Sequence, residues 1–252
     1  MSATFFTPSS AFRSRHTVQL PADEARHALR VLRKREGDEI CLVDGEGGWY
    51  RARLESGGRA RILEAKREVG EPTYRLSIGV GLLKNRSRFE IFLEKAVELG
   101  VSTIIPMHTQ RSEAFAFRHA RARQILIAAM KQCGRSRIPH LHQPLPFTDI
   151  FTADDAHVRM IAHEKAGLRN SLPAEIETAG PTSRIRILTG PEGGFTDEEL
   201  RQATLCGYKP VSLGPRRLRS ETAALAAAAT VMMVLAKHPH DGIVREAAAE
   251  DP

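Results

Sequence analysis

Cysteine, aromatic residues and long apolar runs are all scarce in this chain of 252 residues, of which Phe, Trp and Tyr make up only 6%. The three cysteines, Cys41, Cys133 and Cys206, are too few and too widely spaced for a disulfide framework or a cysteine metal site. The longest apolar run, at residues 222–236, is too short to cross a membrane. The first residues lack the features of a signal peptide. We therefore predict a cytoplasmic protein with buried or inert thiols, no metal and no membrane partner.

Phosphate-binding motifs are also missing, although one stretch is built like a phosphate loop. Residues 186–200, RILTGPEGGFTDEEL, are predicted to form a strand, a glycine-rich turn and the start of a helix. Neither G-x-G-x-x-G nor the P-loop lysine is present, Pro191 removes one N–H donor, and Glu192 adds negative charge. The loop suits a flat, unphosphorylated and cationic ligand such as S-adenosylmethionine, whereas a plain tight turn fits the same residues at least as well.

Acidic residues are scarce in the middle of the chain. The net charge is +7, and residues 73–143 hold 12 Lys and Arg against 4 Asp and Glu. The balance is +2 over residues 1–72 and −3 over residues 144–252. A concentrated excess of arginine favours an anionic polymer as the partner, because the planar guanidinium fits phosphate and stacks on bases. A solvated basic helix face is the alternative.

What the second part of the chain does contain is a regular alternation of strand and helix patterns. Strands are predicted at residues 74–82, 101–108, 157–164, 184–190 and 209–214. Helices are predicted at residues 88–100, 118–134, 197–207 and 220–238. The third of these helices has a capping box, Thr196 with Glu199. This alternation predicts an α/β fold with a mostly parallel sheet and helices on both faces.

The first part of the chain has a different pattern. A helix is predicted at residues 22–33, and three short strands separated by glycines follow within residues 37–69. One helix with several short strands in about 70 residues predicts a small β-barrel-like domain. We place the domains at residues 1–72 and 73–240, and we expect a loose tail at residues 241–252.

Two further segments carry clusters of arginine. Residues 211–229, VSLGPRRLRSETAALAAAA, place Arg216, Arg217 and Arg219 just before an alanine-rich helix. Arginines at the start of a buried helix are costly to desolvate unless they meet an anion, which favours a functional site at this position. The alanines also fit ordinary core packing. In residues 128–141, AAMKQCGRSRIPHL, the arginines can hold phosphates and Gln132 can bond a base edge.

Five separated blocks connect these segments to a known family. In chain order they read HALRVLRKREGDEI, EKAVELGVSTIIP, AAMKQCGRSRIP, GPEGGFTDEE and LGPRRLRSETA. Together, over about residues 20–237, they resemble the ribosomal RNA small subunit methyltransferase E family. The resemblance implies a SPOUT-type α/β domain with a deep trefoil knot, preceded by a PUA-like β-barrel. It also implies a homodimer that uses S-adenosylmethionine to methylate N3 of a uridine in 16S rRNA of the small ribosomal subunit.

The resemblance further implies which residues form the site. The cofactor is expected on three loops, namely the turn after MIAHE, residues 188–194 and residues 213–220. The expected cofactor-binding residues are His163, Leu188, Gly190, Glu192, Gly193, Leu213, Gly214, Leu218 and Ser220. The expected RNA-binding residues are Arg30, Arg33, Lys34, Arg118, Arg121, Gln132, Arg135 and Arg137.

Three residues are candidates for catalysis. Arg219 is expected to stabilise the charge that moves onto the uracil oxygens, with Arg111 as the second candidate for that role. Glu221 is expected to take the N3 proton or to orient Arg219.

Two positions depart from the family pattern. Thr4 stands where arginine is frequent, and Arg217 stands where an aliphatic residue is usual.

Several alternatives fit the same residues. Glu192 lies beside the cationic end of the cofactor or caps the helix that follows it. Arg219 acts on the substrate or forms a structural ion pair with Glu221. For the whole chain, the alternatives are a non-enzymatic RNA-binding protein and another SPOUT methyltransferase, acting on tRNA or on a ribose 2′-OH.

Overall fold

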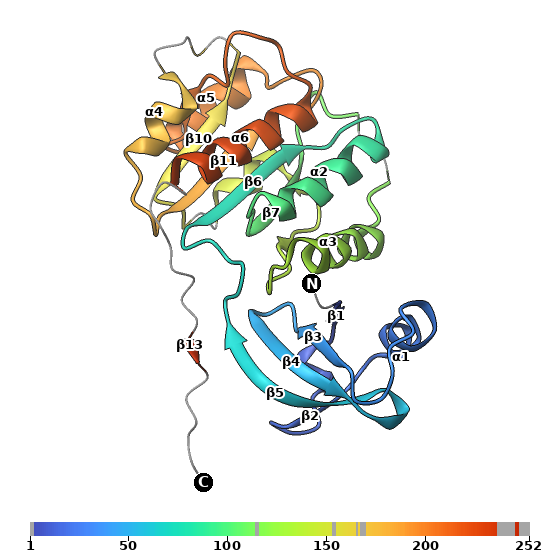
Figure 1. Ribbon diagram of the computed structural model, residues 1–252. Helices are drawn as coiled ribbons and strands as arrows, with labels where there is room; N and C mark the ends of the chain where they lie inside the picture. The colour runs from blue at the N-terminus through green and yellow to red at the C-terminus, as the bar shows by residue number, and fades with distance from the viewer. Residues whose placement is uncertain are drawn as a thin grey trace. The chain divides into compact units, whose positions relative to one another are not determined.

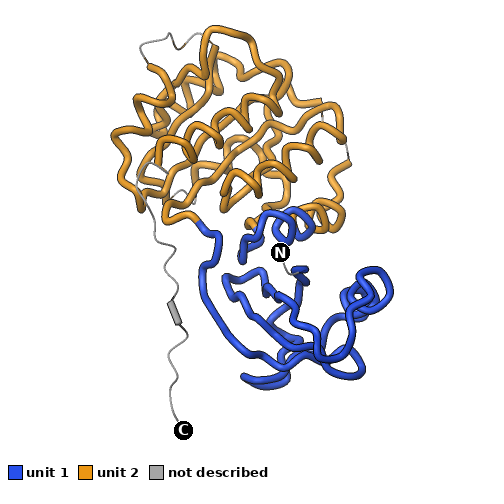
Figure 2. Tube along the Cα trace, viewed as in Figure 1, with its two compact units in different colours: residues 1–71, 127–138, 241–252 blue, residues 72–126, 139–240 orange. Residues whose placement is uncertain are grey.

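The computed structural model describes residues 3–113, 116–152, 155–164, 166, 170–235 and 245–246. The chain divides into two compact units, coloured separately in Figure 2. Unit 1 comprises residues 1–71, 127–138 and 241–252, and unit 2 comprises residues 72–126 and 139–240. Most of the segment expected as a loose tail lies outside the described residues. Within the described part of the chain, every helix is too short or too polar to cross a lipid bilayer.

Unit 2 contains the predicted parallel sheet, with helices around it (Figure 1). Its strands are β6 (Arg75–Gly81), β7 (Thr103–His108), β8 (His140–Leu141), β9 (Leu145–Pro146), β10 (Val158–Ala162), β11 (Arg184–Thr189) and β12 (Lys209–Val211). They are ordered β12-β10-β11-β6-β7-β8, with β9 also on β7, and all their pairings are parallel. The prediction of an α/β class with a parallel sheet is therefore confirmed.

The helices of unit 2 are α2 (Arg86–Glu98), α4 (Leu172–Glu177), α5 (Asp197–Leu205) and α6 (Ser220–Leu235), with the 3-10 helix η4 (Phe147–Phe151). The helix α3 (His119–Cys133) begins in unit 2 and ends in unit 1. Asn85 accepts the Ser87 and Arg88 N–H groups, and α2 therefore begins two residues earlier than predicted. The capping box of Thr196 and Glu199 on α5 is confirmed. The short elements α4, β8, β9 and η4 were not predicted.

The central strands of unit 2 carry buried apolar side chains on both faces because both faces are covered. Leu188 of β11 packs in one cluster with Met107 of β7, Ile161 of β10, Ala203 of α5 and residues of η4. Alternation along the strand turns Ile185 and Ile187 to the opposite face. On that side α6 lies against β6 and β11, and it also contacts α2 and α4. The alanines of α6 permit this close packing, and Ala224, Ala227 and Ala228 are fully buried.

Unit 1 is a small, mostly antiparallel half-barrel. Its strands are β1 (Thr4–Phe6), β2 (Thr17–Gln19), β3 (Glu39–Val43), β4 (Gly48–Leu54), β5 (Arg59–Arg67) and β13 (Arg245–Glu246). Only β1 and β3 pair in parallel. Its helical segments are α1 (Ala22–Arg26), the π-helix η2 (His27–Val31), and the 3-10 helices η1 (Ser9–Ala11) and η3 (Ser56–Gly58). The helix predicted over residues 22–33 is thus a short α-helix that continues as a π turn.

The core of unit 1 is built by alternating strand residues. Phe5, Val18, Ile40, Leu42 and Leu54 are almost completely buried in one cluster, which also holds Ala28 of η2.

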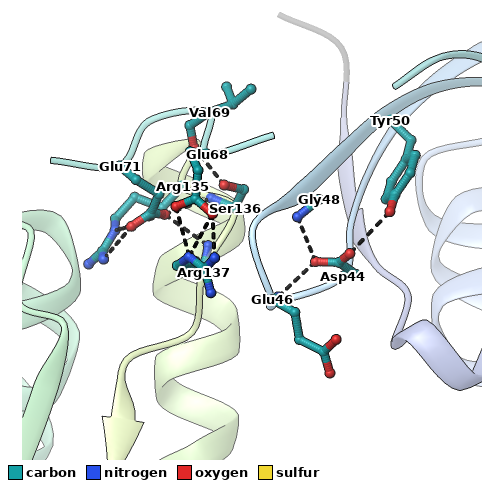
Figure 3. Close-up of polar contacts among 10 residues, drawn as sticks. All are labelled: Asp44, Glu46, Gly48, Tyr50, Glu68, Val69, Glu71, Arg135, Ser136 and Arg137. Atoms are coloured by element: carbon teal, nitrogen blue, oxygen red, sulfur yellow. Dashed lines mark hydrogen bonds and ion pairs between the residues drawn. The ribbon is translucent and has the colours of Figure 1, made fainter. Parts of the chain in front are cut away.

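At the turn between β3 and β4, the Asp44 carboxylate accepts the Glu46 N–H at 2.7 Å, the Gly48 N–H at 2.8 Å and the Tyr50 hydroxyl at 3.1 Å (Figure 3). Burial and then the neighbouring Asp44 charge raise the pKa of Tyr50 to about 12, so Tyr50 remains a donor at neutral pH.

Residues 134–138 fold with unit 1 through a buried carboxylate (Figure 3). Glu71 accepts Nη2 of Arg135 at 2.7 Å and the backbone N–H groups of Ser136 at 3.0 Å and Arg137 at 2.8 Å. The Arg135 and Glu71 side chains are only 4% and 2% exposed. Removing one partner of such a buried pair typically costs about 3–5 kcal/mol, because the other charge stays buried and unpaired. This cluster holds residues 135–137 against residues 68–71, which are far away in sequence.

The three thiols have different environments. Cys41 is buried on β3, and burial raises the pKa of its thiol to about 11, so it stays protonated at neutral pH. Burial also raises the pKa of Cys133. Cys206 is exposed at the end of α5, so for this residue only the expectation of an inert thiol remains, and it stays a prediction.

Candidate functional site

A cavity of about 860 Å³ lies in unit 2 at the carboxyl ends of β10, β11 and β12. These strands are parallel neighbours, so their following loops meet at one edge of the sheet, where ligands of open α/β sheets usually bind. The lining comes from residues 162–164, 189–195 and 212–220, together with Ala223 on α6 and Arg111 after β7. The volume is in the range of sites for small molecules of about 300–1,000 Å³. The three loops expected to form the site are thus brought together.

The loop after β11 is compact because it contains glycine at three positions. Gly194 has φ +67° and donates its N–H to the Pro191 carbonyl at 2.8 Å. A Cβ atom on Gly190 would lie 3.1 Å from the Cα of Gly194. Any larger side chain at position 190 would therefore press on the backbone of the same loop. The result is a cavity wall made largely of exposed backbone, which a flat ligand can approach closely.

The loop after β12 is held by a serine and by the neighbouring strand end. The Ser212 hydroxyl accepts the Gly214 N–H at 3.2 Å, and Gly214 has φ +115°, a conformation that favours glycine. His163 after β10 donates its backbone N–H to the Val211 carbonyl at 2.9 Å. The loop then runs through Leu218 to the buried Ser220 at the start of α6, and both line the cavity. The backbone of this loop is therefore fixed on both sides of its exposed arginines.

Arg111 holds the glycine loop in place. One of its terminal nitrogens, Nη1, donates to the Gly193 carbonyl at 2.9 Å and to the Phe195 carbonyl at 3.3 Å. Its neighbour Gln110 donates its backbone N–H to Oε1 of Glu199 at 2.8 Å, while Oε2 of Glu199 accepts the Thr196 N–H of the capping box. The segment after β7 is thus bonded to the segment after β11 at two places. Arg111 therefore positions the glycine loop, and because it also lines the cavity, its expected role in catalysis stays a prediction.

The substitution Arg111→Ala is expected to weaken S-adenosylmethionine binding by about tenfold, because the loop loses two charge-assisted hydrogen bonds at a partly solvated site. Isothermal titration calorimetry measures this change. Amide hydrogen exchange should show faster exchange in residues 190–195 and unchanged exchange in β6. An affinity equal to that of the wild type would contradict the positioning role.

The exposed arginines lie on the loop before α6. Arg216, Arg217 and Arg219 line the cavity with exposed side chains and form no ion pair with any described residue. The expected ion pair of Arg219 with Glu221 is therefore wrong. Glu221 is buried instead, and its Oε1 lies 3.7 Å from Nε of Arg88 on α2. Because Glu221 does not line the cavity, its expected roles as proton acceptor and as the partner that orients Arg219 do not fit this geometry.

Most residues expected to bind the cofactor line this cavity. They are His163, Gly190, Glu192, Gly193, Leu213, Gly214, Leu218 and Ser220. Leu188 is the exception, because its side chain is fully buried in the core and the lining begins at the next residue, Thr189. The alternative in which Glu192 caps α5 is wrong. Thr196 is the cap, and the Glu192 carboxylate accepts the Lys84 N–H at 3.2 Å.

Sequence reasoning missed several residues of the wall. They include Ala162, Phe195, Ser212 and Ala223. Each lies within a few residues of the carboxyl end of a strand or at the start of α6. Had the strand ends been predicted more accurately, position alone would have indicated them.

The residues expected to bind RNA separate into exposed and buried groups. Arg30, Arg33 and Gln132 in unit 1, and Arg118 and Arg121 in unit 2, are exposed, while Lys34 is half-buried. Arg121 forms an ion pair with Glu90 at 3.4 Å that leaves its side chain largely accessible. The expectation that Arg135 and Arg137 bind RNA does not fit their positions. The guanidinium of the first is buried against Glu71 and that of the second is paired with Glu68, so neither is free to bind phosphate.

Known proteins resemble this chain over nearly its whole length. Residues 70–232 match the model of an RNA methyltransferase domain, and residues 20–63 match that of an RNA methyltransferase PUA domain. Ribosomal RNA small subunit methyltransferase E of Synechocystis is 33% identical over 225 residues, which cover 87% of this chain and 74% of that protein. The chain belongs to the ribosomal RNA small subunit methyltransferase E family. The cavity and its arginines lie inside the segment that matches the methyltransferase domain.

Solved structures of this family share the fold. A probable rRNA methyltransferase from Porphyromonas gingivalis is 32% identical, covers 94% of this chain and 100% of its own, and superposes with a TM-score of 0.83. The family E methyltransferase from Neisseria gonorrhoeae, which was crystallised with S-adenosyl methionine, is 30% identical, covers 93% of this chain and 98% of its own, and gives a TM-score of 0.79. The family E fold is therefore present over both units.

Proposed function

We propose that this chain methylates N3 of a uridine in 16S rRNA with S-adenosylmethionine as the methyl donor. The cavity formed by the three loops at the ends of β10, β11 and β12 carries this proposal, because it combines a glycine-rich wall with exposed arginines that form no ion pair within the described residues. Membership of the family and the bound S-adenosyl methionine of the Neisseria relative support the same reaction.

The residues of the cavity fit the methyl donor. Gly190, Gly193 and Gly194 leave the wall open to a flat ring, and the size of the cavity matches a molecule of this class. The wall holds the carboxylates of Glu164 and Glu192, which suit a ligand with positive charge. When bound, S-adenosylmethionine supplies a methyl carbon attached to a positively charged sulfur. The glycine loop would hold its adenine and ribose, with Leu213 and Leu218 opposite.

The chain itself must prepare the uridine. N3 carries a hydrogen at neutral pH and must lose it as the new N–C bond forms, so a base has to accept a proton. Arg219 is exposed on the cavity wall and forms no ion pair with the described part of the chain, and it would stabilise the negative charge on the uracil oxygens. Glu164 and Glu192 offer carboxylates on the same wall for the proton. The base would be turned out of its stack to reach this cavity.

The remaining expectations from the family resemblance belong to the same proposal. We place an RNA-binding domain at residues 1–72 and the methyltransferase domain, with its trefoil knot, at residues 73–240, followed by the tail at residues 241–252. The protein would act as a homodimer in the cytoplasm, on 16S rRNA or on the small ribosomal subunit. The exposed Arg118, just before α3, and Arg121 of α3 would contribute phosphate contacts.

Transfer of a labelled methyl group tests the function directly. The protein is incubated with isotopically labelled S-adenosylmethionine and either 16S rRNA or small subunits from a strain without this enzyme, and the nucleosides are separated by mass spectrometry. We expect labelled N3-methyluridine. Label on a ribose 2′-OH or on tRNA would reject the uridine N3 target. Binding of RNA without label and without calorimetric heat from the methyl donor would favour a non-enzymatic RNA-binding protein.

A further inference from the structure

An exposed apolar surface in unit 1 has no role in the cavity chemistry. Leu29, Val31 and Leu32 are 43%, 66% and 42% exposed, and we call these three residues the apolar tip. They lie on and directly after the π-helix η2, whereas the neighbouring Ala28 is fully buried in the core of unit 1. The core therefore fixes η2 in position while the apolar tip faces solvent. A π turn is rare and often occurs at functional sites.

Positive charge dominates the segment that carries the apolar tip. Residues 26–35 hold five Lys and Arg and no Asp or Glu, and four acidic residues, Asp23, Glu24, Glu36 and Asp38, flank this segment. Arg30 and Arg33 are exposed, Lys34 is half-buried, and none of the three forms an ion pair with a described residue. The carboxylate of Glu24 is already paired with Lys131 at 2.6 Å. The surface thus offers apolar contact and free cations side by side, a combination that matches the bases and phosphates of a nucleic acid strand.

The backbone is strained where one of these cations stands. Arg33 has φ 53°, a left-handed conformation that glycine usually adopts at the end of a helix. The Lys34 N–H donates to the Ala28 carbonyl at 2.9 Å, and the Leu32 N–H donates to the His27 carbonyl at 3.0 Å, which closes the turn around it. Glycine would relieve the strain, yet this chain carries an exposed arginine. Strain of this kind is frequent at binding sites.

We propose that the apolar tip contacts unstacked bases of the substrate RNA while the cations beside it hold phosphates of the same strand. This inference rests on the proposed function for the identity of the RNA. Charge complementarity selects RNA over a second copy of the chain, because two such surfaces would bring ten cations together. The apolar contact would supply affinity that does not depend on salt, and the cations would supply the salt-dependent part.

Binding of 16S rRNA at several salt concentrations separates these contributions. Val31→Ser is expected to weaken binding about tenfold at every salt concentration, since the lost contact is apolar. Arg30→Ala is expected to reduce the slope of log affinity against log salt by about one. The matched controls are Leu205→Ser, at another exposed apolar residue, and Arg201→Ala, at an exposed arginine of α5, and both should bind as the wild type does.

Arg33→Gly is a second test that does not depend on the apolar tip. Relief of the left-handed strain should raise the melting temperature by roughly 2 °C, while the loss of a cation weakens RNA binding. A higher melting temperature with unchanged RNA affinity would overturn the role of Arg33.

The inference and the proposed function fail in different ways. If the wild type methylates 16S rRNA but Val31→Ser binds RNA normally, the role of the apolar tip is overturned and the function stands. If Val31→Ser instead changes the sedimentation of the protein without changing RNA affinity, the tip is an interface between copies. If the wild type binds RNA through the tip but never methylates it, only the proposed function is lost.

Discussion

Replacing Arg219 by alanine is expected to reduce the rate of methyl transfer by about 10²–10³-fold and to leave the affinity for S-adenosylmethionine nearly unchanged. The side chain is exposed on the cavity wall and has no ion pair with a described residue, so its removal breaks no structural contact. Charge develops on the uracil oxygens only as N3 loses its proton, and the arginine therefore contributes mainly to the transition state. Single-turnover kinetics with saturating RNA measure the rate, and calorimetry measures the cofactor affinity.

Two variants make this test specific. Arg219→Lys keeps the charge but loses the planar pair of donors, and we expect an intermediate rate. Arg201→Ala removes an exposed arginine that is paired with Glu198 on α5 and does not line the cavity, and we expect the wild-type rate. A full rate for Arg219→Ala on 16S rRNA would show that another group stabilises the substrate.

Replacing Gly193 by valine is expected to weaken S-adenosylmethionine binding by at least about 100-fold without unfolding the protein. A Cβ atom at this position would lie 3.0 Å from the Cβ of Arg111, so the arginine that holds the loop must move. The two methyl groups of valine would also intrude on the cavity wall. Because Gly193 does not have a positive φ and lies at the surface, the backbone itself can accept a side chain. Calorimetry measures the affinity, and thermal unfolding checks the fold.

Gly180→Val is the matched control for this substitution. Gly180 also lies in an exposed loop of unit 2, and its added Cβ would meet only the Ser183 hydroxyl at 3.9 Å. We expect cofactor binding equal to that of the wild type. Gly193→Val with wild-type affinity would mean that the methyl donor does not bind against this loop.

The predictions from sequence were most accurate where a local pattern fixes the structure. The capping box of α5 needs only residues three apart, and Thr196 and Glu199 form it as predicted. The alternation of strand and helix patterns over unit 2 indicated a parallel sheet, because a helix between two strands lets them run in the same direction. The glycines after β11 and β12 marked two walls of the cavity, and among them Gly194 and Gly214 have positive φ angles that few other residues adopt.

The errors concern side chains whose role depends on a partner far away in sequence. Arg135 stands beside other cations in the sequence and was predicted to bind phosphate. Its guanidinium instead forms a buried ion pair with Glu71, which is 64 residues away in sequence. Glu221 was matched to the nearby Arg219, and its partner is Arg88 on another helix. For Arg111 the catalytic role stays a prediction, and only the structure shows that its guanidinium also donates to carbonyls more than 80 residues later.

The sequence by itself therefore determined the α/β class, the two kinds of domain, the family and the glycine loops, because each is encoded in local spacing or in blocks of consecutive residues. The tertiary structure alone decided which arginines are free and which are neutralised, and that the strand ends of β10, β11 and β12 converge on one cavity. It also decided that the apolar tip of unit 1 is exposed. The physical reason is that burial and ion pairing depend on distances between chain segments, which no local pattern specifies.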